Sequence, residues 1–383
     1  MTGRAIGLLV TVPVLAALSW LLGYPVLAVL AISFAIVLAL GAITVARPPT
    51  SVIDRDVDPL KVTRGQPATV VLTHRNRSPL PSAPIDATDA IGHLNIDVTI
   101  PVTRPRGTSE ASYRFVTSKR GYLPIGPAVI TRRDPWGIFR RSREVGGQAE
   151  ISVYPRIVSI PAPDIVSRLS RDAGAADVAA GSDRFHTLRE YVVGDELRKV
   201  HWPSSAKTGT MVVKQMVDSP QPRILLFCDC DEGSYADPAD FESAIDTTAS
   251  LANAIVATGV PTTVIVGQSH QSTEVTRTDD ISRLLENLLT VASEPKPAAS
   301  QWLRAIAIRS RATALVVVTG SENNLISSMA GLRSTFSQTA VYRLGVQSEL
   351  VDRRRGLTVT DTVDIDTLRS LLRPPVRKGG PAS

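Results

Sequence analysis

The densest mixture of charged, aromatic and turn-forming residues lies at 181–214, which read GSDRFHTLREYVVGDELRKVHWPSSAKTGTMVVK. Apolar residues follow neither the helical nor the strand period here, so the stretch is neither a buried strand nor a plain amphipathic helix. We expect residues 187–192 to form a short turn or helix that Gly194 and Asp195 end. Asp195 would then cap the following turn at 196–200.

The charges of this stretch favour a structural interpretation. Arg189 and Arg198 can pair with Glu190 and Asp195 in an ion-pair network. Such networks are commoner in proteins than catalytic clusters, and they also perturb the pKa values of their members. We therefore expect these charges to stabilise the local structure through ion pairs at the protein surface.

A catalytic interpretation stays open beside it. Its candidate acids, bases or metal ligands are His186, Glu190, Asp195 and His201. A Ser–His–Asp arrangement is also available from either Ser204 or Ser205 together with His201 and Asp195. No nucleophile elbow surrounds either serine, and no pair of these residues has the spacing of a motif such as H-E-x-x-H.

The stretch from Phe185 to Lys214 resembles the signature of the bacterial DUF58 family, F-H-x-L-R-E-Y-x-x-G-D-x-L-R-x-V-H-W-x-x-x-A-K-x-G-x-x-x-V-K. Three upstream segments resemble the part of the family that precedes the signature: RGYLPIGP at 120–127, RDPWGIF at 133–139 and VYPR at 153–156. The resemblance runs from the N-terminal apolar segment to about residue 345.

The DUF58 resemblance implies an adaptor protein that works with a MoxR-type AAA+ ATPase. Exposed charges would then set partner choice and association rate. The residues expected to form the interaction surface are Phe185, His186, Arg189, Glu190, Tyr191, Gly194, Asp195, Arg198, His201, Trp202 and Lys207.

The N-terminus has the composition of a membrane anchor. No charged residue occurs between Arg4 and Arg47, and a single helix of that length would measure about 60 Å, twice a bilayer core. Gly-Tyr-Pro at 23–25 interrupts the run, which predicts two helices at 5–22 and 25–46.

The flanking charges predict the orientation of this transmembrane hairpin, residues 1–47. Basic residues lie outside both helices and none lies in the turn, so the positive-inside rule places the soluble domains in the cytoplasm. The two cysteines, Cys228 and Cys230, have no disulfide framework, which fits a reducing compartment. A cleaved signal peptide is the alternative, and the second apolar run argues against it.

Residues 48–160 are expected to form a β-sandwich, because short β-rich runs alternate with turns and no helical pattern occurs. Candidate strands lie at 51–57, 69–74, 95–101, 109–116, 126–132 and 149–153. The DUF58 resemblance implies an immunoglobulin-like domain here. Residues 133–137, Arg-Asp-Pro-Trp-Gly, predict a turn. We interpret it as a structural corner, with a docking loop as the alternative.

Residues 222–350 alternate strands and helices, which predicts a parallel, doubly wound sheet in an α+β multidomain chain. Strands are expected at 223–228, 261–266, 312–318 and 339–344, and helices at 238–258, 280–290, 300–309 and 322–332. The layout resembles a von Willebrand factor A domain. The signature segment, 161–221, precedes this domain, and 351–383 would be a tail with one helix at 366–372.

The strand ends of that domain hold the candidate metal ligands Asp229, Asp231 and Thr319. Ligands of doubly wound sheets bind beyond the carboxyl ends of the strands, and Mg²⁺ and other hard divalent cations prefer oxygen donors. The von Willebrand A resemblance implies a site that begins D-x-S-x-S and later uses a Thr and an Asp. Here Asp231 and Gly233 replace the two serines, and Gly320 replaces the later Asp. A solvated acidic loop is the alternative.

Two functional classes follow. We expect an interaction or assembly module in the cell membrane, anchored by two helices; the alternative is a membrane-tethered hydrolase, with or without a divalent metal. The net charge of +6 suits anionic headgroups or acidic partners. No basic run with interleaved aromatics argues for nucleic acid, and no Walker A motif or dinucleotide fingerprint argues for a nucleotide cofactor.

Overall fold

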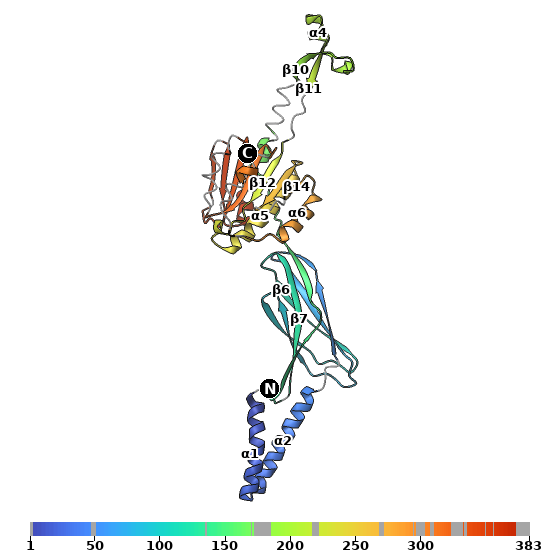
Figure 1. Ribbon diagram of the computed structural model, residues 1–383, viewed down its shortest axis with the longest axis vertical. Coiled ribbons are helices and arrows are strands. Elements are labelled where there is room, and N and C mark those ends of the chain that lie inside the picture. The colour runs from blue at the N-terminus through green and yellow to red at the C-terminus, as the bar shows by residue number, and fades with distance from the viewer. Residues whose placement is uncertain are drawn as a thin grey trace, which may run out of the picture. The chain divides into compact units, whose positions relative to one another are not determined.

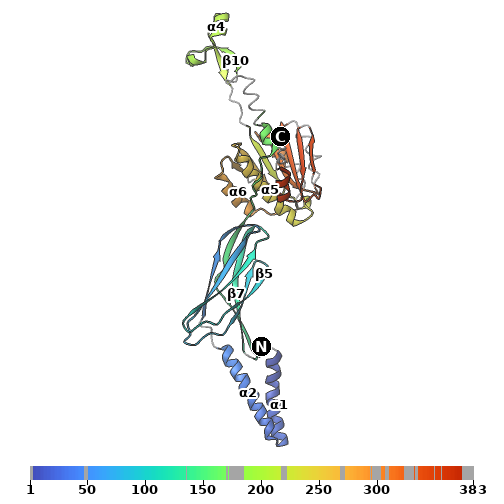
Figure 2. The same cartoon turned by 180° about the vertical axis from the view of Figure 1, so that it is seen from behind.

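The computed structural model describes residues 3–46, 51–134, 136–169, 171, 185–216, 222–267, 272–293, 295, 303–306, 310–322, 332, 335–348, 350–354 and 356–372. The chain divides into two compact units, Met1–Tyr154 and Pro155–Ser383. Their helices and strands are labelled in Figures 1 and 2.

Two apolar helices begin the first unit, as predicted: α1 (Gly3–Leu22) and α2 (Pro25–Ala46). Gly23 has a positive φ of 71°, which glycine adopts without strain, and it turns the chain between them. The Ser19 hydroxyl donates a hydrogen bond of 2.9 Å to the Tyr24 carbonyl and closes the turn. Both helices are long and apolar enough to cross a membrane. The side of the membrane on which the remaining chain lies stays a prediction.

The rest of the first unit consists of two sheets. One has the order β1-β3-β6, and the other has the order β2-β9-β7-β4-β5 with β8 paired to β7. The strands are β1 (Ser51–Asp58), β2 (Lys61–Thr63), β3 (Pro67–Asn76), β4 (Ile85–Ile91), β5 (Leu94–Ile100), β6 (Thr108–Val116), β7 (Gly121–Arg133), β8 (Arg140–Val145) and β9 (Ala149–Tyr154).

One apolar core joins the two sheets, with side chains such as Leu72 and Phe115 from the first and Ile100 and Ile151 from the second. Six of the nine strands overlap the predicted ones. Sequence reasoning missed β2, β4 and β8. The inward face of β4 includes Asp89, which breaks its apolar alternation, and β8 is exposed along almost its whole length.

A buried ion pair crosses this core. The Arg55 guanidinium lies 2.5 Å from Asp89 Oδ1, and both side chains are almost fully buried. The Tyr113 hydroxyl donates to Asp89 Oδ2 at 2.6 Å. Arg55 also donates to the carbonyls of Ile125 and Gly147. The pair therefore joins β1, β4, β6 and the β8–β9 turn, and burial together with the Asp89 carboxylate raises the pKa of Tyr113.

The second unit contains a seven-stranded sheet of order β14-β13-β12-β15-β16-β18-β17. Its five inner strands are parallel, and the two edge strands are antiparallel to their neighbours. The four strands that the sequence predicted all belong to the parallel part of the sheet, and the antiparallel edge strands were not among those predicted. The strands are β12 (Ile224–Cys228), β13 (Thr262–Val266), β14 (Ser272–Val275), β15 (Ala314–Gly320), β16 (Gln338–Leu344), β17 (Leu350–Arg354) and β18 (Leu357–Asp361).

Both faces of the sheet are covered. The helices α5 (Pro238–Val256), α6 (Asp280–Leu289) and α9 (Ile365–Leu372) share one core with alternate residues of the inner strands (Figure 2). Leu303, Leu332 and Phe336 pack on the opposite face. This two-sided burial explains why β12 and β15 are continuously apolar.

The sheet uses more of the chain than the sequence indicates. Residues 351–361, which we expected in a tail, form most of β17 and all of β18. Residues 155–169, expected to divide between the β-sandwich and the signature segment, pack on α5. There the Arg156 amide donates to Asp246 at 2.8 Å and the Val158 amide to Ser250 at 2.9 Å. Most of the helices predicted at 300–309 and 322–332 lies outside the described residues.

We expect Asp89→Ala to destabilise the two sheets by about 3–5 kcal/mol, because it leaves the Arg55 guanidinium buried without its counter-charge. Asp54→Ala is the matched control, since it breaks an exposed pair with Arg75 and should cost about 0–1 kcal/mol. Native-state hydrogen exchange of β1 and β4 amides in the detergent-solubilised protein measures both. Equal losses would contradict a structural role for the buried pair.

Candidate functional site

Most of the signature folds into a small lobe, residues 185–216, built on a two-stranded sheet. The strand β10 (Phe185–Glu190) pairs antiparallel with β11 (Val212–Met216). The prediction of a turn or helix at 187–192 is therefore wrong. A pairing partner more than twenty residues later in the chain fixes an extended conformation that the local pattern did not indicate.

Gly194 and Asp195 form the turn that the sequence predicted. The Asp195 amide donates to the Val192 carbonyl at 3.0 Å, and Gly194 has a positive φ of 115°. The Asp195 carboxylate accepts from the Val192 amide at 2.9 Å and from the Arg189 guanidinium at 2.6 Å. The Asp195 carboxylate therefore closes the turn at 192–195, which precedes it in the chain. The expected cap of the next turn is absent from the described contacts, since η1 (Leu197–Lys199) has no side-chain cap.

His201 acts as the N-cap of α4 (Trp202–Thr208). Its Nδ1 lies 2.7 Å from Ser204 Oγ and accepts from the Ser204 amide at 3.3 Å. Ser205 Oγ donates to the His201 carbonyl and accepts from the Val212 amide. Both serines and the histidine thus hold α4 against β11. This is the geometry of helix capping.

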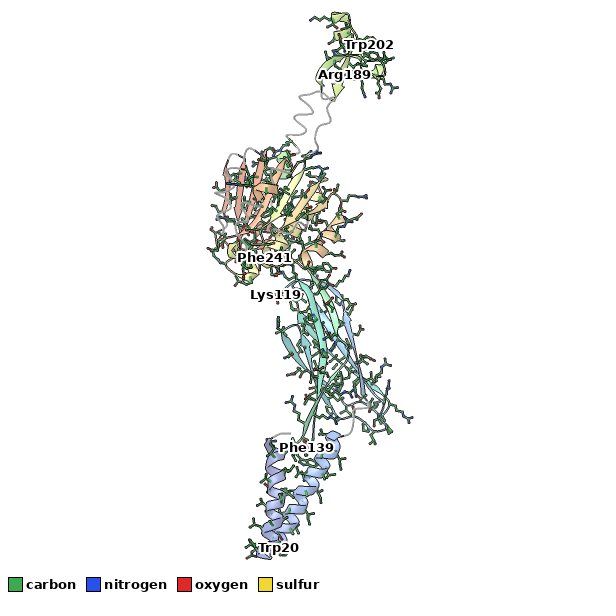
Figure 3. The ribbon with its side chains drawn as sticks, viewed as in Figure 1. Trp20, Lys119, Phe139, Arg189, Trp202 and Phe241 are labelled. Carbon is green, nitrogen blue, oxygen red and sulfur yellow. The ribbon has the colours of Figure 1, made fainter. Side chains whose placement is uncertain are left out.

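The structure brings the predicted interaction residues into one lobe but does not make them one network. Arg189 pairs with Asp195, and Lys199 pairs with Glu196 at 3.4 Å. The exposed members are Arg189, Glu190, Gly194, Arg198, Trp202 and Lys207, and the half-buried ones are Tyr191, Asp195 and His201. The side chains of Phe185 and His186 lie outside the described part of the chain. Figure 3 labels Arg189 and Trp202.

Exposed apolar side chains are the feature of this lobe that sequence reasoning missed. Among its described side chains, the buried ones are Val200, Val212 and Val213. The large apolar side chains that face solvent are Val192, Val193, Leu197, Trp202 and Met211. The signal was present in the sequence, where Val192, Val193 and Leu197 surround a turn that no apolar period explains.

A second cluster lies at the switch point of the large sheet. The inner strands follow the order 2-1-3-4-5, in which the crossover direction reverses between β12 and β15. Asp229 follows β12 there and is 1% exposed. Its Oδ2 accepts hydrogen bonds from Thr319 Oγ1 at 2.8 Å and from Ser234 Oγ at 2.7 Å. Its Oδ1 accepts from the Asp231 amide at 3.0 Å.

Sequence reasoning placed Asp229 and Thr319 in this cluster but missed Ser234, the last residue of η2 (Glu232–Ser234), because it lies outside the D-x-S-x-S spacing. The later Asp of that pattern would stand at the position of Gly320, where there is no space for a side chain. A Cβ on Gly320 would lie 2.0 Å from the Ser234 carbonyl oxygen. The Asp231 carboxylate accepts from the Gly233 amide at 3.0 Å and caps η2.

These oxygen donors are of the kind that Mg²⁺ prefers, but the set fits a cation only in part. Asp229 is the one buried carboxylate of the cluster, and the Ser234 and Thr319 hydroxyls both donate to it. Among the residues that the structure describes, no three His, Cys, Asp or Glu side chains are placed to hold a metal. The arrangement has the geometry of a hydrogen-bonded anchor between β12, η2 and β15.

Residues 187–334 match the model of a family described as protein of unknown function DUF58. This confirms that part of the DUF58 resemblance, and the part upstream of residue 187 stays a prediction. No curated protein matches the chain.

Several solved structures are similar to parts of the chain. The CARDB domain of the PF1109 protein from Pyrococcus furiosus, in complex with di-metal ions, is 13% identical, with a TM-score of 0.22 over 27% of this chain and 88% of that one. BslA, a bacterial hydrophobin, is 13% identical, with a TM-score of 0.18 over 29% and 100%. Red sea bream transglutaminase is 16% identical, with a TM-score of 0.20 over 27% and 15%. Likenesses this distant carry no argument about function.

The Arg189–Asp195 pair predicts a pH dependence for the 192–195 turn. The hydrogen bond from Arg189, followed by that from the Val192 amide, lowers the pKa of Asp195 below its ordinary value. The pair therefore stabilises the turn above the ordinary Asp pKa of about 3.9, and this is lost as pH falls through the lowered pKa. An NMR titration of the Val192 amide measures it. Asp195→Asn keeps an oxygen acceptor without the charge, and the same pH profile in this variant would contradict the assignment.

The anchor at Asp229 predicts that Thr319→Val destabilises the second unit by about 1.5–3 kcal/mol, because a buried carboxylate loses a hydrogen-bond donor. Thr278→Val replaces an exposed threonine and should change stability by less than about 0.5 kcal/mol. Thermal unfolding with EDTA and with Mg²⁺ measures both. The loss should be the same in each condition, whereas a Mg²⁺-dependent stabilisation that Thr319→Val abolishes would establish a cation site instead.

Proposed function

We propose, with the match of residues 187–334 to DUF58 as the premise, that this protein is a membrane-anchored interaction module whose lobe docks a partner protein. The observation that carries the proposal is the imbalance of apolar surface in residues 185–216. Val193 is 95% exposed and Leu197 is 60% exposed, while the buried apolar side chains described in the lobe are three valines.

The lobe is small, and this explains why it exposes more apolar surface than it buries. Folded units below about 40 residues rarely bury enough apolar surface alone, and most rely on disulfides, metals or association. Both cysteines of the chain lie outside the lobe, at 228 and 230. Exposed apolar patches in soluble domains commonly mark interaction sites. Association with a partner would bury Val193, Leu197 and Trp202.

The charges of the lobe suit the rim of such an interface. Arg189, Arg198 and Lys207 are exposed in the same lobe as Trp202, and tryptophan and arginine are among the residue types most enriched among side chains that dominate binding energy. Exposed charges contribute chiefly to partner choice and association rate. The expected interface thus has an apolar centre and a charged, mainly basic rim.

The partner we propose is a MoxR-type AAA+ ATPase, which the DUF58 resemblance implies. The immunoglobulin-like assignment of the two-sheet region and the von Willebrand A-like assignment of the α/β region belong to the same proposal. So does the cytoplasmic location of both, which the positive-inside rule supports. The 2-1-3-4-5 order of the inner strands is consistent with a doubly wound domain but does not distinguish among families that share it.

The hydrolase alternative has weaker support from the same residues. The close contact of His201 with Ser204 would suit a base and a nucleophile, but the Ser204 amide donates to the same ring nitrogen, as in a helix cap. Asp195, the third member of the formal triad, is engaged by Arg189 and the Val192 amide. The described contacts of these groups are therefore accounted for by local structure.

A charge placed in the apolar centre of the lobe should abolish docking. We expect Leu197→Glu in the full-length protein to weaken binding to the purified MoxR-type ATPase of the same genome by at least about tenfold, because it buries an unpaired carboxylate. Leu94→Glu is the matched control, since Leu94 is a similarly exposed leucine in the first unit, at 63%. Biolayer interferometry with the detergent-solubilised protein measures both affinities.

Each outcome has a consequence. If wild type does not bind the ATPase, the partner assignment is wrong. Equal binding by the two variants would show that the lobe does not contain the interface. Hydrolysis of ester or phosphoester substrates by wild type, lost in His201→Ala but kept in Leu197→Glu, would support the hydrolase alternative instead.

A further inference from the structure

Two loops of the first unit meet at one end of its two sheets. Residues 77–84 connect β3 to β4, and residues 101–107 connect β5 to β6. The Ser82 amide donates a hydrogen bond of 2.9 Å to the Thr103 carbonyl, and the Thr103 amide donates to Ser82 Oγ at 3.2 Å. The loops therefore form one continuous surface, which we call the loop platform and define as residues 77–84 and 101–107.

A buried asparagine at the end of β3 holds the platform together. Asn76 Oδ1 accepts from the Ser78 amide at 3.0 Å, and Asn76 Nδ2 donates to the Leu80 carbonyl at 2.8 Å. The same Nδ2 donates to the Arg104 carbonyl at 3.2 Å, and the Asn76 amide donates to the Gly107 carbonyl at 2.9 Å. One residue thus crosslinks both loops, so the side chains that the platform exposes are held on a hydrogen-bonded scaffold.

The platform exposes apolar and basic side chains together. Leu80 is 58% exposed and Val102 is 59% exposed. Arg77, Arg104 and Arg106 are exposed as well, and neither loop contains an Asp or a Glu. Arg106 has a positive φ of 52°, a left-handed conformation that is uncommon for a residue with a Cβ. The fold therefore keeps an arginine at a position where glycine would be less strained.

The positive charge of the platform is local. In the adjoining strands, Asp86 accepts from the Thr99 hydroxyl at 3.3 Å, and Asp54 lies 3.3 Å from the Arg75 guanidinium. Glu110 is exposed on β6, beyond the second loop. The three arginines of the platform form no ion pair with the residues that the structure describes. The platform therefore suits an anionic ligand.

The chain connects the platform closely to the apolar helices. Four residues separate Ala46, the last of α2, from Ser51, the first of β1. A segment of that length spans at most about 18 Å even when fully extended. Ser51 stands opposite Asn76 in the sheet. Arg75 stands opposite Thr108, the first residue of β6. Both loops of the platform therefore adjoin the start of the strand that follows α2.

The tip of the β7–β8 hairpin is a tight turn. Asp134 follows β7, and its carboxylate accepts from the amides of Trp136 at 3.1 Å and Phe139 at 2.5 Å. The Asp134 carbonyl accepts from the Gly137 amide at 3.0 Å. These contacts confirm the turn predicted at 133–137.

That tip lies at the platform end of the sheets and against α2. Thr131, near the end of β7, stands opposite Asp86, which follows the first platform loop by two residues. A Cβ on Gly41 would lie 3.1 Å from the ring of Phe139, which is labelled in Figure 3. Gly41 belongs to the part of α2 that is apolar enough to cross a membrane, Pro25–Ile43. When α2 crosses a bilayer, this end of the sheets therefore lies at its border.

We propose that the loop platform is a membrane-surface site for anionic phospholipids. Leu80 and Val102 enter the boundary between headgroups and acyl chains, and the three arginines bind lipid phosphates, which guanidinium groups hold with paired hydrogen bonds. This inference rests on the membrane anchoring proposed above, and it is independent of the partner proposed for the lobe at 185–216.

A lipid surface explains the platform better than a protein partner does. Exposed apolar side chains combined with basic ones are typical of segments that bind membrane interfaces, where apolar burial and attraction to anionic lipids add together. The short connection from α2 keeps the platform close to the bilayer. A protein partner would have to fit into the space between the platform and the lipid.

The test measures the depth of three nitroxide labels in the full-length protein, reconstituted into nanodiscs of phosphatidylglycerol or of phosphatidylcholine. Single cysteines replace residues of similar exposure: Ile32 of α2 at 59%, Leu80 at 58%, and Leu94, at the end of β5 remote from the platform, at 63%. Collision rates with oxygen, which concentrates in lipid, and with a water-soluble nickel chelate report the depth of each label. Both native cysteines are buried, and wild type treated with the label gives the background.

In phosphatidylglycerol, the labels at Ile32 and Leu80 should collide more with oxygen than with the nickel chelate, and the label at Leu94 should show the reverse. The label at Leu80 should become more accessible to the chelate in phosphatidylcholine, because the anionic phosphates are then balanced by choline. Raising the salt concentration from about 0.1 M to 1 M should act in the same direction, since it screens exposed charges.

Three charge variants, each made in the Leu80→Cys protein, identify the groups responsible. Arg77→Gln, Arg104→Gln, Arg106→Gln should lower the ratio of lipid-seated to free platforms at least about tenfold, since each basic residue near an anionic surface contributes roughly fivefold to binding. Lysine at the same three positions should keep most of that ratio, which shows that the loops still fold. The control variant removes three exposed charges outside the platform and should keep the ratio: Arg114→Gln, Lys119→Gln, Arg277→Gln.

The outcomes separate this inference from the anchoring on which it rests. A lipid pattern at Ile32 with an aqueous pattern at Leu80 would overturn the inference and leave the anchoring intact. An aqueous pattern at Ile32 would overturn the anchoring and the inference with it. Equal seating in both lipids, an unchanged ratio in the triple glutamine variant, or an equal loss in the control variant would each show that the platform does not bind anionic headgroups.

Discussion

Two-sided burial of the central strands β12 and β15 is the constraint on which the second unit depends. A parallel sheet that is covered on both faces leaves no solvent for polar groups except at the strand ends. The chain reverses its crossover direction between these two strands, so the polar groups of both ends meet at one point. Asp229 is buried there with hydroxyl donors from Ser234 and Thr319 and the amide of Asp231. Residues 155–169 are held by the same principle, because Asp246 and Ser250 on the buried side of α5 find their donors in the incoming backbone.

The first unit solves a similar problem with a buried ion pair. Its two sheets share one apolar core, and a single charge inside it would be costly without a partner. Arg55 and Asp89 compensate each other, while Tyr113 and two backbone carbonyls take up their remaining hydrogen-bonding capacity. The pair specifies which strands meet, since β1 and β4 belong to different sheets. Each unit thus surrounds one buried carboxylate, Asp89 or Asp229, with donors from several elements.

The sequence was sufficient wherever a local pattern carries the information. The uncharged run from residue 5 to 46 and its Gly-Tyr-Pro break determine the two helices, and continuous apolar runs determine β12 and β15. It was insufficient where a distant partner decides. Residues 185–190 form a strand because β11 lies beside them, and Leu350–Arg354 and Leu357–Asp361 join the sheet because β16 offers an edge. At the candidate sites, Asp229 and Thr319 were found from strand-end reasoning, whereas Ser234 depends on how one loop bends over Gly320.

Among its described side chains, the lobe exposes five large apolar residues and buries three valines. The lobe exposes Val192, Val193 and Leu197 around a turn that the Asp195 carboxylate closes by accepting hydrogen bonds from the Val192 amide and from Arg189. The carboxylate satisfies a backbone amide and a guanidinium of the same turn, so the exposed residues are presented on a hydrogen-bonded scaffold. Ordered presentation lowers the conformational entropy lost on binding, which matters most for small contact surfaces. Exposed apolar side chains in a flexible loop would need no further explanation. On a turn that internal hydrogen bonds hold in one conformation, they are better explained by a surface that binds a partner.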